Sequence, residues 1–183
     1  PGETAQLGRW FELLPRGWPM AAITRQLDAG DAHLHAWLRA DPAHVRPDMT
    51  GARVLAVGHL GLTAEEAQAL VSPLRPLFGD AGFQLSAPDP SRWYVALPVE
   101  SRLPVFSSPA QVLGADLFDH LPQGPEGRRW RALLNEAQIL LHNHPVNAAR
   151  IAAGRLPVNS LCFWGAGRLP NQVRARLGRV HAA

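Results

Sequence analysis

The fold class is decided by residues 53–97, which read RVLAVGHLGLTAEEAQALVSPLRPLFGDAGFQLSAPDPSRWYVAL. Three short runs in this stretch are rich in β-branched and aromatic residues, and they predict strands at 53–57, 83–87 and 93–97. Two prolines and an aspartate at 88–91 favour a tight loop between the last two strands. The stretch is therefore expected to supply three strands of a small sheet.

A helix is expected between the first two of these strands. Thr63 stands three residues before Glu66, which is the capping-box arrangement that satisfies the first helical N–H groups. From Ala67 onwards, apolar residues recur at the 3, 4, 7 spacing of one buried helix face. Pro73 and Pro76 are expected to bend this helix or to end it early, because proline lacks the N–H that an inner turn needs.

Upstream, residues 1–30 predict two short helices on either side of the proline-rich turn at 15–19. Residues 34–39 alternate between apolar and polar side chains and predict a strand, and residues 43–47 predict a second extended piece. Ala-Asp-Pro at 40–42 is expected to form a turn between them.

Downstream, residues 98–127 are expected to form a surface connector with one helical turn near Val112. The clearest helix is predicted for 126–143, where one face is apolar. Its expected core residues are Trp130, Leu133, Leu134, Ala137, Leu140 and Leu141. A short helix at 146–153 and a final strand at 158–164 complete the prediction.

These elements predict an α+β fold, with a small mixed or antiparallel sheet and helices packed on one face of it. We expect a single domain of this kind. Residues 1–30 are expected to form an N-terminal helical segment, and residues 31–183 the α/β domain.

Composition excludes several classes of protein. The 183 residues are 46% hydrophobic and 18% charged, which excludes wholesale disorder. No apolar run approaches the roughly 20 residues that span a bilayer, and residues 1–16 carry early charges, so neither a membrane segment nor a secretory signal is expected. Cys162 is the one cysteine of the sequence, which excludes an internal disulfide and favours a reducing cytoplasm as the compartment.

Basic residues are concentrated in the last third of the chain. Residues 1–127 hold 9 Arg against 14 acidic residues, a balance of −5, whereas residues 128–183 hold 9 Arg against Glu136 alone, a balance of +8. Such a segment either docks on the acidic part of the chain, binds a small anion, or binds nucleic acid. Nucleic acid is the least favoured partner, because the sequence lacks an aromatic-basic recognition motif.

The segment 142–167 contains the candidate binding residues. His144, Asn147, Arg150 and Asn159 are expected to converge on an anion, because arginine is a fixed cation and the amides donate through N–H. Gly165 and Gly167, read as part of a plain turn after the last strand, would lie beside this site. In the alternative interpretation, the two asparagines cap their elements and Arg150 pairs with an acid of the N-terminal half.

No catalytic or metal-binding residue is assigned from the sequence. It contains no nucleophile elbow, phosphate-binding loop or dinucleotide fingerprint. His142 and His144 diverge by about 200° at a helix end, so they are not expected to share a metal. Asp116, Asp119 and His120 are interpreted as a turn packed down by its apolar neighbours rather than as a site.

A series of motifs in the same segment resembles the archaeal-type cofactor-independent phosphoglycerate mutases. The series is His144-Pro145-Val146-Asn147, Arg150, Gly154, Pro157-Val158-Asn159, then Trp164-Gly165-Ala166-Gly167 with Pro170. Upstream, Gly61-Leu62-Thr63 and Arg92-Trp93-Tyr94-Val95 are similar to the insert domain of that family. The chain most closely resembles a bacterial group described as phosphoglycerate mutase-like, or as regulatory protein E of a pathogenicity-factor cluster.

The resemblance implies a mutase insert domain and its return strand, without the catalytic core. In the mutases, two metal ions and a phosphorylated Ser or Thr belong to an alkaline-phosphatase-like core, whose motifs are not found in this sequence. We therefore expect no cofactor in this chain; Mn²⁺ or Mg²⁺ would be bound only if a catalytic core lies elsewhere in a longer protein.

The expected function is that of a regulatory or ligand-binding protein without mutase activity of its own. Its partner would be a phosphorylated small molecule or another protein. Two alternatives stay open: a metal-dependent phosphoglycerate mutase or phosphotransferase whose catalytic residues lie outside this sequence, and a nucleic-acid-binding regulator.

Overall fold

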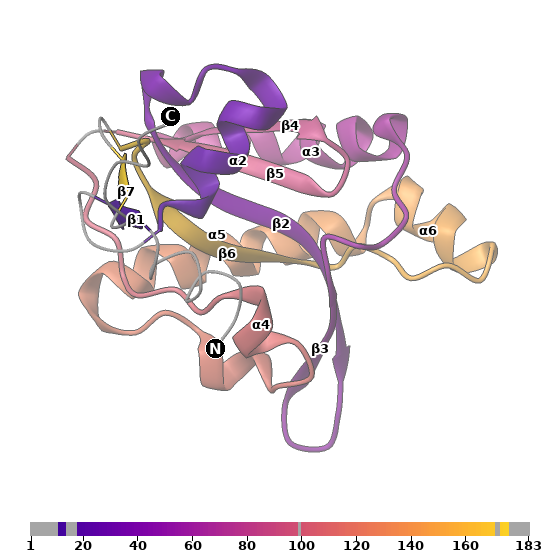
Figure 1. Cartoon of the computed structure of the whole chain (residues 1–183). Coiled ribbons are helices and arrows are strands. Elements are labelled where there is room, and N and C mark those ends of the chain that lie inside the picture. Colours follow the sequence, from indigo (N-terminus) through magenta and orange to yellow (C-terminus); the bar gives the residue numbers. More distant parts are fainter. Residues whose placement is uncertain (1–10, 14–17, 99, 171–172, 176–183) are drawn as a thin grey trace, which may run out of the picture.

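The structure, a computed structural model, describes residues 11–13, 18–98, 100–170 and 173–175. Its main sheet has five strands, and all pairings between them are antiparallel. The strands are β2 (Ala36–Pro47), β3 (Ala52–Val57), β4 (Gln84–Asp89), β5 (Arg92–Leu97) and β6 (Ser160–Gly167). The predicted α+β class is thereby confirmed, and the sheet is antiparallel (Figure 1).

The long strand β2 organises the sheet. Arg39 of β2 pairs with Tyr94 of β5 and with Trp164 of β6, so β5 and β6 lie on opposite sides of β2. Ala43 pairs with Val57 of β3 and with Ser160 of β6, which places β3 on the same side as β5. From Ala43 to Pro47, β2 continues with β3 as a hairpin that projects from the sheet (Figure 1).

Helices cover both faces of the sheet. The helical elements are α2 (Met20–Ala29), η1 (Ala32–Leu34), α3 (Ala64–Asp80), α4 (Pro109–Val112), η2 (Leu117–His120), α5 (Gly124–His142) and α6 (Pro145–Ala152). Leu38 and Val95 join the core under α3 and α5, whereas Trp37 and Tyr94 pack with Ala21 of α2. Since neighbouring strand residues point to opposite faces, α2 lies on the second face, which the sequence did not predict. None of the helices in the described residues is long and apolar enough to cross a membrane.

Helix α3 confirms the predicted capping box, and its length excludes one of the two effects expected of its prolines. The Thr63 Oγ1 accepts from the Glu66 N–H, and the Glu66 carboxylate accepts from the Thr63 N–H, each over 3.1 Å. The helix continues through Pro73 and Pro76 to Asp80, so the prolines do not end it early. Apolar side chains before and after the prolines are fully buried, and this packing outweighs the lost backbone hydrogen bonds.

The predicted turn at 40–42 is also wrong, because Ala40-Asp41-Pro42 lies inside β2. A proline in a central strand normally removes a ladder hydrogen bond. Pro42 lies where the neighbour of β2 changes from β5, paired with 36–39, to β3, paired with 43–47. Its missing N–H therefore lies between the end of the β5 pairing and the start of the β3 pairing, where no ladder hydrogen bond is lost. The Pro42 carbonyl accepts from the Gly58 N–H over 2.8 Å.

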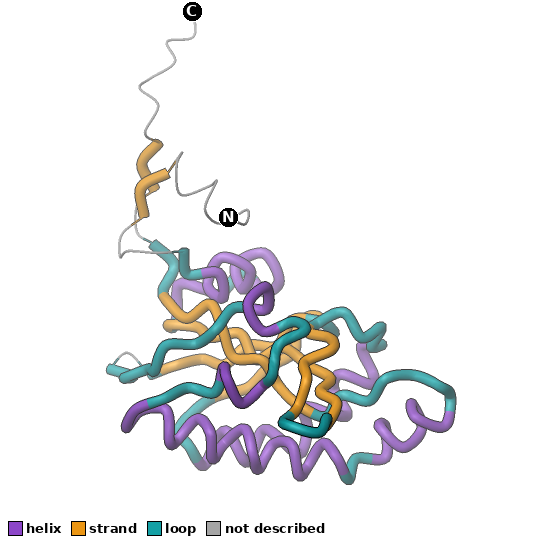
Figure 2. The backbone as a smooth tube through the Cα atoms, turned by 90° about the horizontal axis from the view of Figure 1, so that it is seen from below, coloured by secondary structure: helices purple, strands orange, loops and turns teal. Residues whose placement is uncertain are grey.

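The chain ends differ from the sequence prediction in the part that is described. The second expected N-terminal helix is confirmed as α2, but Phe11–Leu13 forms strand β1, paired with β7 (Val173–Ala175). Figure 2 shows this two-stranded ribbon beside the main body. The rest of the first expected helix lies outside the described residues, and the division at residue 30 stays a prediction. At the other end, Gly165 and Gly167 belong to β6 rather than to a turn.

The later elements follow the prediction closely. Helical turns α4 and η2 lie in the 98–127 connector, and α5, α6 and β6 match the last two helices and the last strand to within a few residues. Trp130, Leu133, Leu134, Ala137 and Leu141 are buried, but Leu140 is 38% exposed. A straight helix drifts by about 20° over seven residues, so Leu140 lies at the edge of the buried stripe.

This difference between two leucines of α5 predicts unequal costs for the same substitution. Leu134→Ala is expected to lower the free energy of unfolding by about 2 to 5 kcal/mol, because it leaves a cavity in the core. Leu140→Ala, the matched control, is expected to lower it by less than about 1 kcal/mol. Urea denaturation of both variants checks the expectation, and equal losses would show that the two side chains are equally buried.

Candidate functional site

The candidate site predicted from the sequence lies around α6 and the chain that leads into β6. His144 is the N-cap residue of α6, where its Nδ1 accepts from the Val146 N–H over 3.1 Å. Because Nδ1 accepts, Nε2 carries the proton and donates to the Ala69 carbonyl over 2.9 Å. Both ring nitrogens of His144 are thus bonded within the protein.

Asn147 is 2% exposed, and its amide ties three segments together. Its Nδ2 donates to the carbonyls of Leu141 and Val158, each over 2.7 Å, and its Oδ1 accepts from the Val158 N–H over 2.8 Å. The amide therefore joins the end of α5 to the chain that enters β6.

Arg150 is 3% exposed and joins α6 to the start of α3. Its NH1 donates to the Glu66 carboxylate over 3.0 Å, its Nε donates to the Leu156 carbonyl over 2.8 Å, and its NH2 donates to the Leu60 carbonyl. Burial acts to raise the pKa of Glu66, but hydrogen bonds from the Thr63 N–H and Arg150 outweigh it and hold that pKa below its usual value. Arg150 thus pairs with an acid of the N-terminal half, as the alternative interpretation expects.

The other predicted site residues lie on β6 or directly before it. Asn159 bonds both the N–H and the carbonyl of Val45 over 2.8 Å, so its side chain extends the ladder of β2. Gly165 and Gly167 lie against Met20 and Pro19. At about 3.3 Å per residue, Gly165 is roughly 20 Å and Gly167 roughly 26 Å along the strand from Asn159.

The structure therefore brings His144, Asn147 and Arg150 together and separates the two glycines from them, which corrects the expectation that Gly165 and Gly167 flank the same site. The N–H groups expected to bind an anion are largely bonded to protein carbonyls and to Glu66. The anion site itself stays a prediction.

A second polar cluster, which the sequence analysis missed, lies between β2, β6 and α2. Asp41 is 2% exposed, and the Arg39 guanidinium binds its two oxygens over 2.8 Å each. The Trp164 Nε1 also donates to Asp41 over 2.8 Å, and Arg39 donates to Thr24 of α2. Burial raises the pKa of Asp41, against the opposing effects of Arg39 and Trp164. The sequence could have indicated this cluster, because Arg39 and Asp41 are two residues apart and therefore lie on one face of a strand.

Cys162 lies opposite Asp41 in the β2–β6 pairing and is buried. Burial, together with the nearby Asp41 carboxylate, raises the pKa of the Cys162 thiol to about 12. The thiolate is the reactive form, so we expect Cys162 to react with a disulfide reagent far more slowly in the native protein than in denaturant. The time course of thiol labelling in the two conditions checks this, and comparable rates would show an accessible thiol.

Helix α2 forms two further ion pairs, one with the loop that follows it and one with β5. Arg25 binds Asp31 through Nε at 2.6 Å and lies 4.2 Å above the Trp37 ring. Arg92 binds Asp28 through Nε at 2.7 Å, and the Tyr94 hydroxyl donates to the same carboxylate. These contacts hold α2 against β2 and β5.

The carboxylates of these pairs predict a pH dependence of stability. The hydrogen bond from Arg25 holds the pKa of Asp31 below 3.8. A pKa that is lower in the folded state adds stability above the unfolded value, and this stability is lost as the pH falls through the folded value. We therefore expect the destabilisation caused by Asp31→Asn to be present at pH 6 and to shrink below about pH 4. Denaturation curves across this range check it, with Asp80→Asn, an exposed carboxylate, as the control.

The described residues contain no group of three or more His, Cys, Asp or Glu side chains that could hold a metal ion. Asp116, considered above as a possible ligand, caps η2: its Oδ1 accepts from the Phe118 N–H over 3.0 Å and from the Ala52 N–H over 3.2 Å. Leu117 and Leu121 pack against the core, as the interpretation of this segment as a packed turn expects, but Phe118 is 58% exposed.

Comparison with known proteins gives a consistent result. The chain is similar to cofactor-independent phosphoglycerate mutases. A segment of 62 residues is 37% identical to the probable 2,3-bisphosphoglycerate-independent phosphoglycerate mutase of Geobacter sulfurreducens, and covers 34% of this chain and 16% of that protein. A segment of 70 residues is 34% identical to the corresponding mutase of Methanothrix thermoacetophila, and covers 38% of this chain and 18% of that protein.

A solved structure extends the similarity to most of the fold. The cofactor-independent phosphoglycerate mutase from Thermoplasma acidophilum matches 74% of this chain with a TM-score of 0.51 and 26% identity, over 37% of its own length. No protein-family model matches the chain. The matched segments of the curated relatives span only 16 to 18% of those proteins, so the similarity concerns a part of a mutase.

Proposed function

We propose that this chain is a non-catalytic, ligand-binding part of a phosphoglycerate mutase-like protein, and that its ligand is a phosphorylated small molecule. The observation that carries the proposal is the structural match, which covers 74% of this chain but 37% of the mutase. The described residues do not fit a two-metal centre, so no chemical step is assigned to them. Regulation of a partner protein, as in the bacterial group that the sequence resembles, would then depend on occupancy by this ligand.

The paired ends of the described chain support a role as one part of a larger assembly. Strands β1 and β7, at opposite ends of the sequence, are antiparallel neighbours, with Glu12 opposite Arg174. A domain whose entering and leaving strands lie side by side is suited to insertion into another domain. Any Mn²⁺ or Mg²⁺ would belong to that other domain in this proposal.

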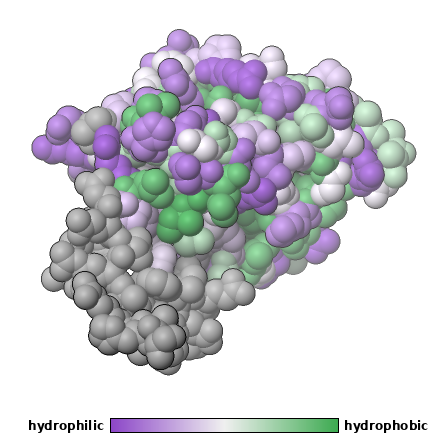
Figure 3. Space-filling model, turned by 45° about the horizontal axis from the view of Figure 1, so that its top comes forward, coloured by the Kyte–Doolittle hydropathy of each residue, from purple (hydrophilic) through white to green (hydrophobic). Residues whose placement is uncertain are grey.

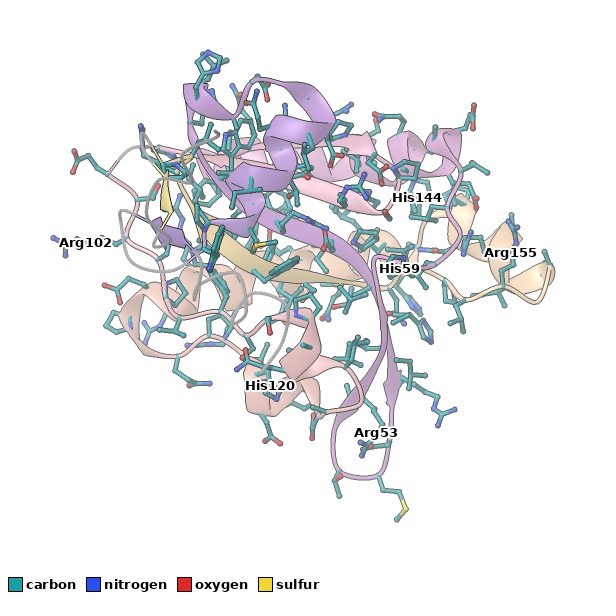
Figure 4. The ribbon with its side chains drawn as sticks, viewed as in Figure 1. Arg53, His59, Arg102, His120, His144 and Arg155 are labelled. Atoms are coloured by element: carbon teal, nitrogen blue, oxygen red, sulfur yellow. The ribbon has the colours of Figure 1, made fainter. Side chains whose placement is uncertain are left out.

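Phosphate recognition is proposed for exposed basic side chains near α6. The Arg150 guanidinium is bonded within the protein, but the Arg155 side chain is 56% exposed and lies 3.9 Å from Glu66. Figure 4 shows Arg155 and His59 on one side of the molecule and Arg102 on the opposite side. An exposed guanidinium offers a planar set of donors that matches phosphate oxygens.

Calorimetric titration with 3-phosphoglycerate, and with glycerate as the ligand without phosphate, tests the proposal. We expect binding of the phosphorylated ligand only, and weakening by about tenfold in Arg155→Ala. Arg102→Ala, an exposed arginine far from α6, is the control and should bind normally. Absence of 3-phosphoglycerate binding would overturn the proposal.

Two further measurements separate the alternatives. Formation of 2-phosphoglycerate by this chain with Mn²⁺ or Mg²⁺ would favour a catalytic mutase. DNA binding that weakens steeply with salt would favour a nucleic-acid-binding regulator, because phosphate contacts release counterions.

A further inference from the structure

A groove of about 530 Å³ lies between α5, η2 and the β2–β3 hairpin, and of the candidate site residues described above only Asn159 lines it. Val45 of the hairpin, with Leu117 and Leu121 of the η2 segment, supplies apolar walls. Figure 1 shows the hairpin projecting on the same side of the sheet as the α4–η2 segment. Figure 3 shows the molecule with its upper surface turned forward, where hydrophobic residues lie in patches among hydrophilic ones. The volume lies within the range of small-molecule sites, roughly 300 to 1,000 Å³.

One stripe of α5 gives this groove its polar character. Asn135, Gln138 and His142 line it, and their spacing of three and four residues places them on the same helix face. The Gln138 Nε2 donates to the buried Ser160 hydroxyl over 2.9 Å, which fixes the amide and leaves its carbonyl oxygen unbonded in the described part of the chain. Asn135 and His142 form no side-chain hydrogen bond with any described residue. An amide both donates and accepts, so the stripe can bind groups of either kind.

Formal charge is missing from the described residues that line the groove, since none of them is Asp, Glu or Arg. The chain as a whole has 18 basic and 15 acidic residues, so this selection of neutral side chains is distinctive. A phosphate or carboxylate would meet no guanidinium in the groove and would lose its hydration without compensation. The groove therefore favours an uncharged ligand.

A smaller apolar pocket of about 40 Å³ adjoins the groove and shares Val45, Leu117 and Leu121 with it. It extends inward to Val112 and Cys162. A water molecule needs roughly 10 to 15 Å³, so the pocket has room for a group of about three heavy atoms. The branched end of a leucine side chain is such a group.

We propose that this groove binds an uncharged ligand with peptide-like amide groups, which pair with Asn135, Gln138 and His142, and with an aliphatic branch that enters the adjoining pocket. The ligand is distinct from the phosphorylated molecule of the proposed function, because the two sites have opposite charge preferences. Either proposal can therefore fail without the other.

N-acetyl-leucine methylamide is the probe that tests this site, with backbone chemical shifts of the whole chain as the readout. We expect saturable shifts of residues in α5 and the hairpin, with a Kd on the order of 1 mM for so small a ligand. N-acetyl-leucine, which carries a carboxylate, and N-acetyl-glycine methylamide, which lacks the branch, should each bind at least about fivefold more weakly. Equal binding of the three compounds, or shifts confined to another surface, would overturn the proposal.

Substitutions in the polar stripe of α5 test whether the probe binds to it. Asn135→Ala removes an exposed amide with no described side-chain hydrogen bond, so it should leave the fold intact and weaken the probe by about threefold or more. Gln84→Ala, an exposed amide on β4 outside the groove, is the matched control and should leave the Kd unchanged. Unaltered binding in Asn135→Ala and in His142→Ala would also overturn the proposal.

A capped tetrapeptide, acetyl-Ala-Leu-Ala-Ala-amide, distinguishes two sources of such a ligand. Tenfold tighter binding than the single-residue probe would identify a peptide segment as the ligand, because further amides then reach the stripe. The same affinity for both would identify a small amide compound, and absence of binding by both would again contradict the site.

Discussion

Arg150→Ala is expected to lower the free energy of unfolding by about 3 to 5 kcal/mol, the cost that follows when one partner of a buried ion pair is removed. The variant leaves Glu66 without its 3.0 Å partner and leaves the carbonyls of Leu60 and Leu156 without a donor. Three segments of the chain, the start of α3, α6 and the entry to β6, meet at this one side chain. Chemical denaturation monitored by tryptophan fluorescence gives the measurement.

Arg155→Ala is the matched control for this prediction. Arg155 lies in the same loop region and approaches the same carboxylate, but at 3.9 Å and with its side chain 56% exposed. Its removal is expected to cost about 0 to 1 kcal/mol, as for other exposed ion pairs. If Arg150→Ala instead unfolds at the wild-type midpoint while phosphate or sulfate binding is lost, Arg150 is a ligand-binding residue and the anion site predicted from the sequence is correct.

The sequence predicted those features whose causes are local. The capping box of α3 depends on two residues three positions apart, and the buried stripe of α5 repeats within one helix. Each of these patterns belongs to one helix, so it could be predicted without knowledge of the tertiary structure. Whether Pro73 and Pro76 would bend α3 or end it early could not be predicted, because the packing around them comes from other elements.

Other features depend on neighbours that are distant in the sequence. Pro42 is tolerated inside β2 because two separate strands end and begin beside it. Two readings of Arg150 stayed open because its acidic partner, Glu66, is 84 positions away. Asn135 and Gln138 lie outside the apolar face predicted for 126–143, but the groove they line is completed by the hairpin and the η2 segment. The sequence therefore indicates that these side chains are polar and lie outside the core, but it does not indicate which other elements lie opposite them.

The second large effect is expected at the buried pair of Arg39 and Asp41. Asp41→Ala removes the acceptor of two guanidinium hydrogen bonds and leaves a positive charge that is 6% exposed. We expect a loss of about 3 to 5 kcal/mol in the free energy of unfolding. Arg53→Ala, which removes an arginine with a 48% exposed side chain from its pair with Asp48, is the control and should cost about 0 to 1 kcal/mol.

A double variant, Arg39→Met with Asp41→Val, separates the cost of an unpaired charge from the value of the pair. Charges removed together leave no buried ion behind, and replacing a buried pair by apolar residues of similar size is often neutral or stabilising. We therefore expect the double variant to be more stable than Asp41→Ala by about 2 kcal/mol or more. If the double variant is instead as unstable as Asp41→Ala, the contact between α2, β2 and β6 is stabilised mainly by the hydrogen bonds of this pair with Trp164 and Thr24. Trp164→Phe, which keeps the ring and removes the indole N–H, would then reproduce much of the loss by itself.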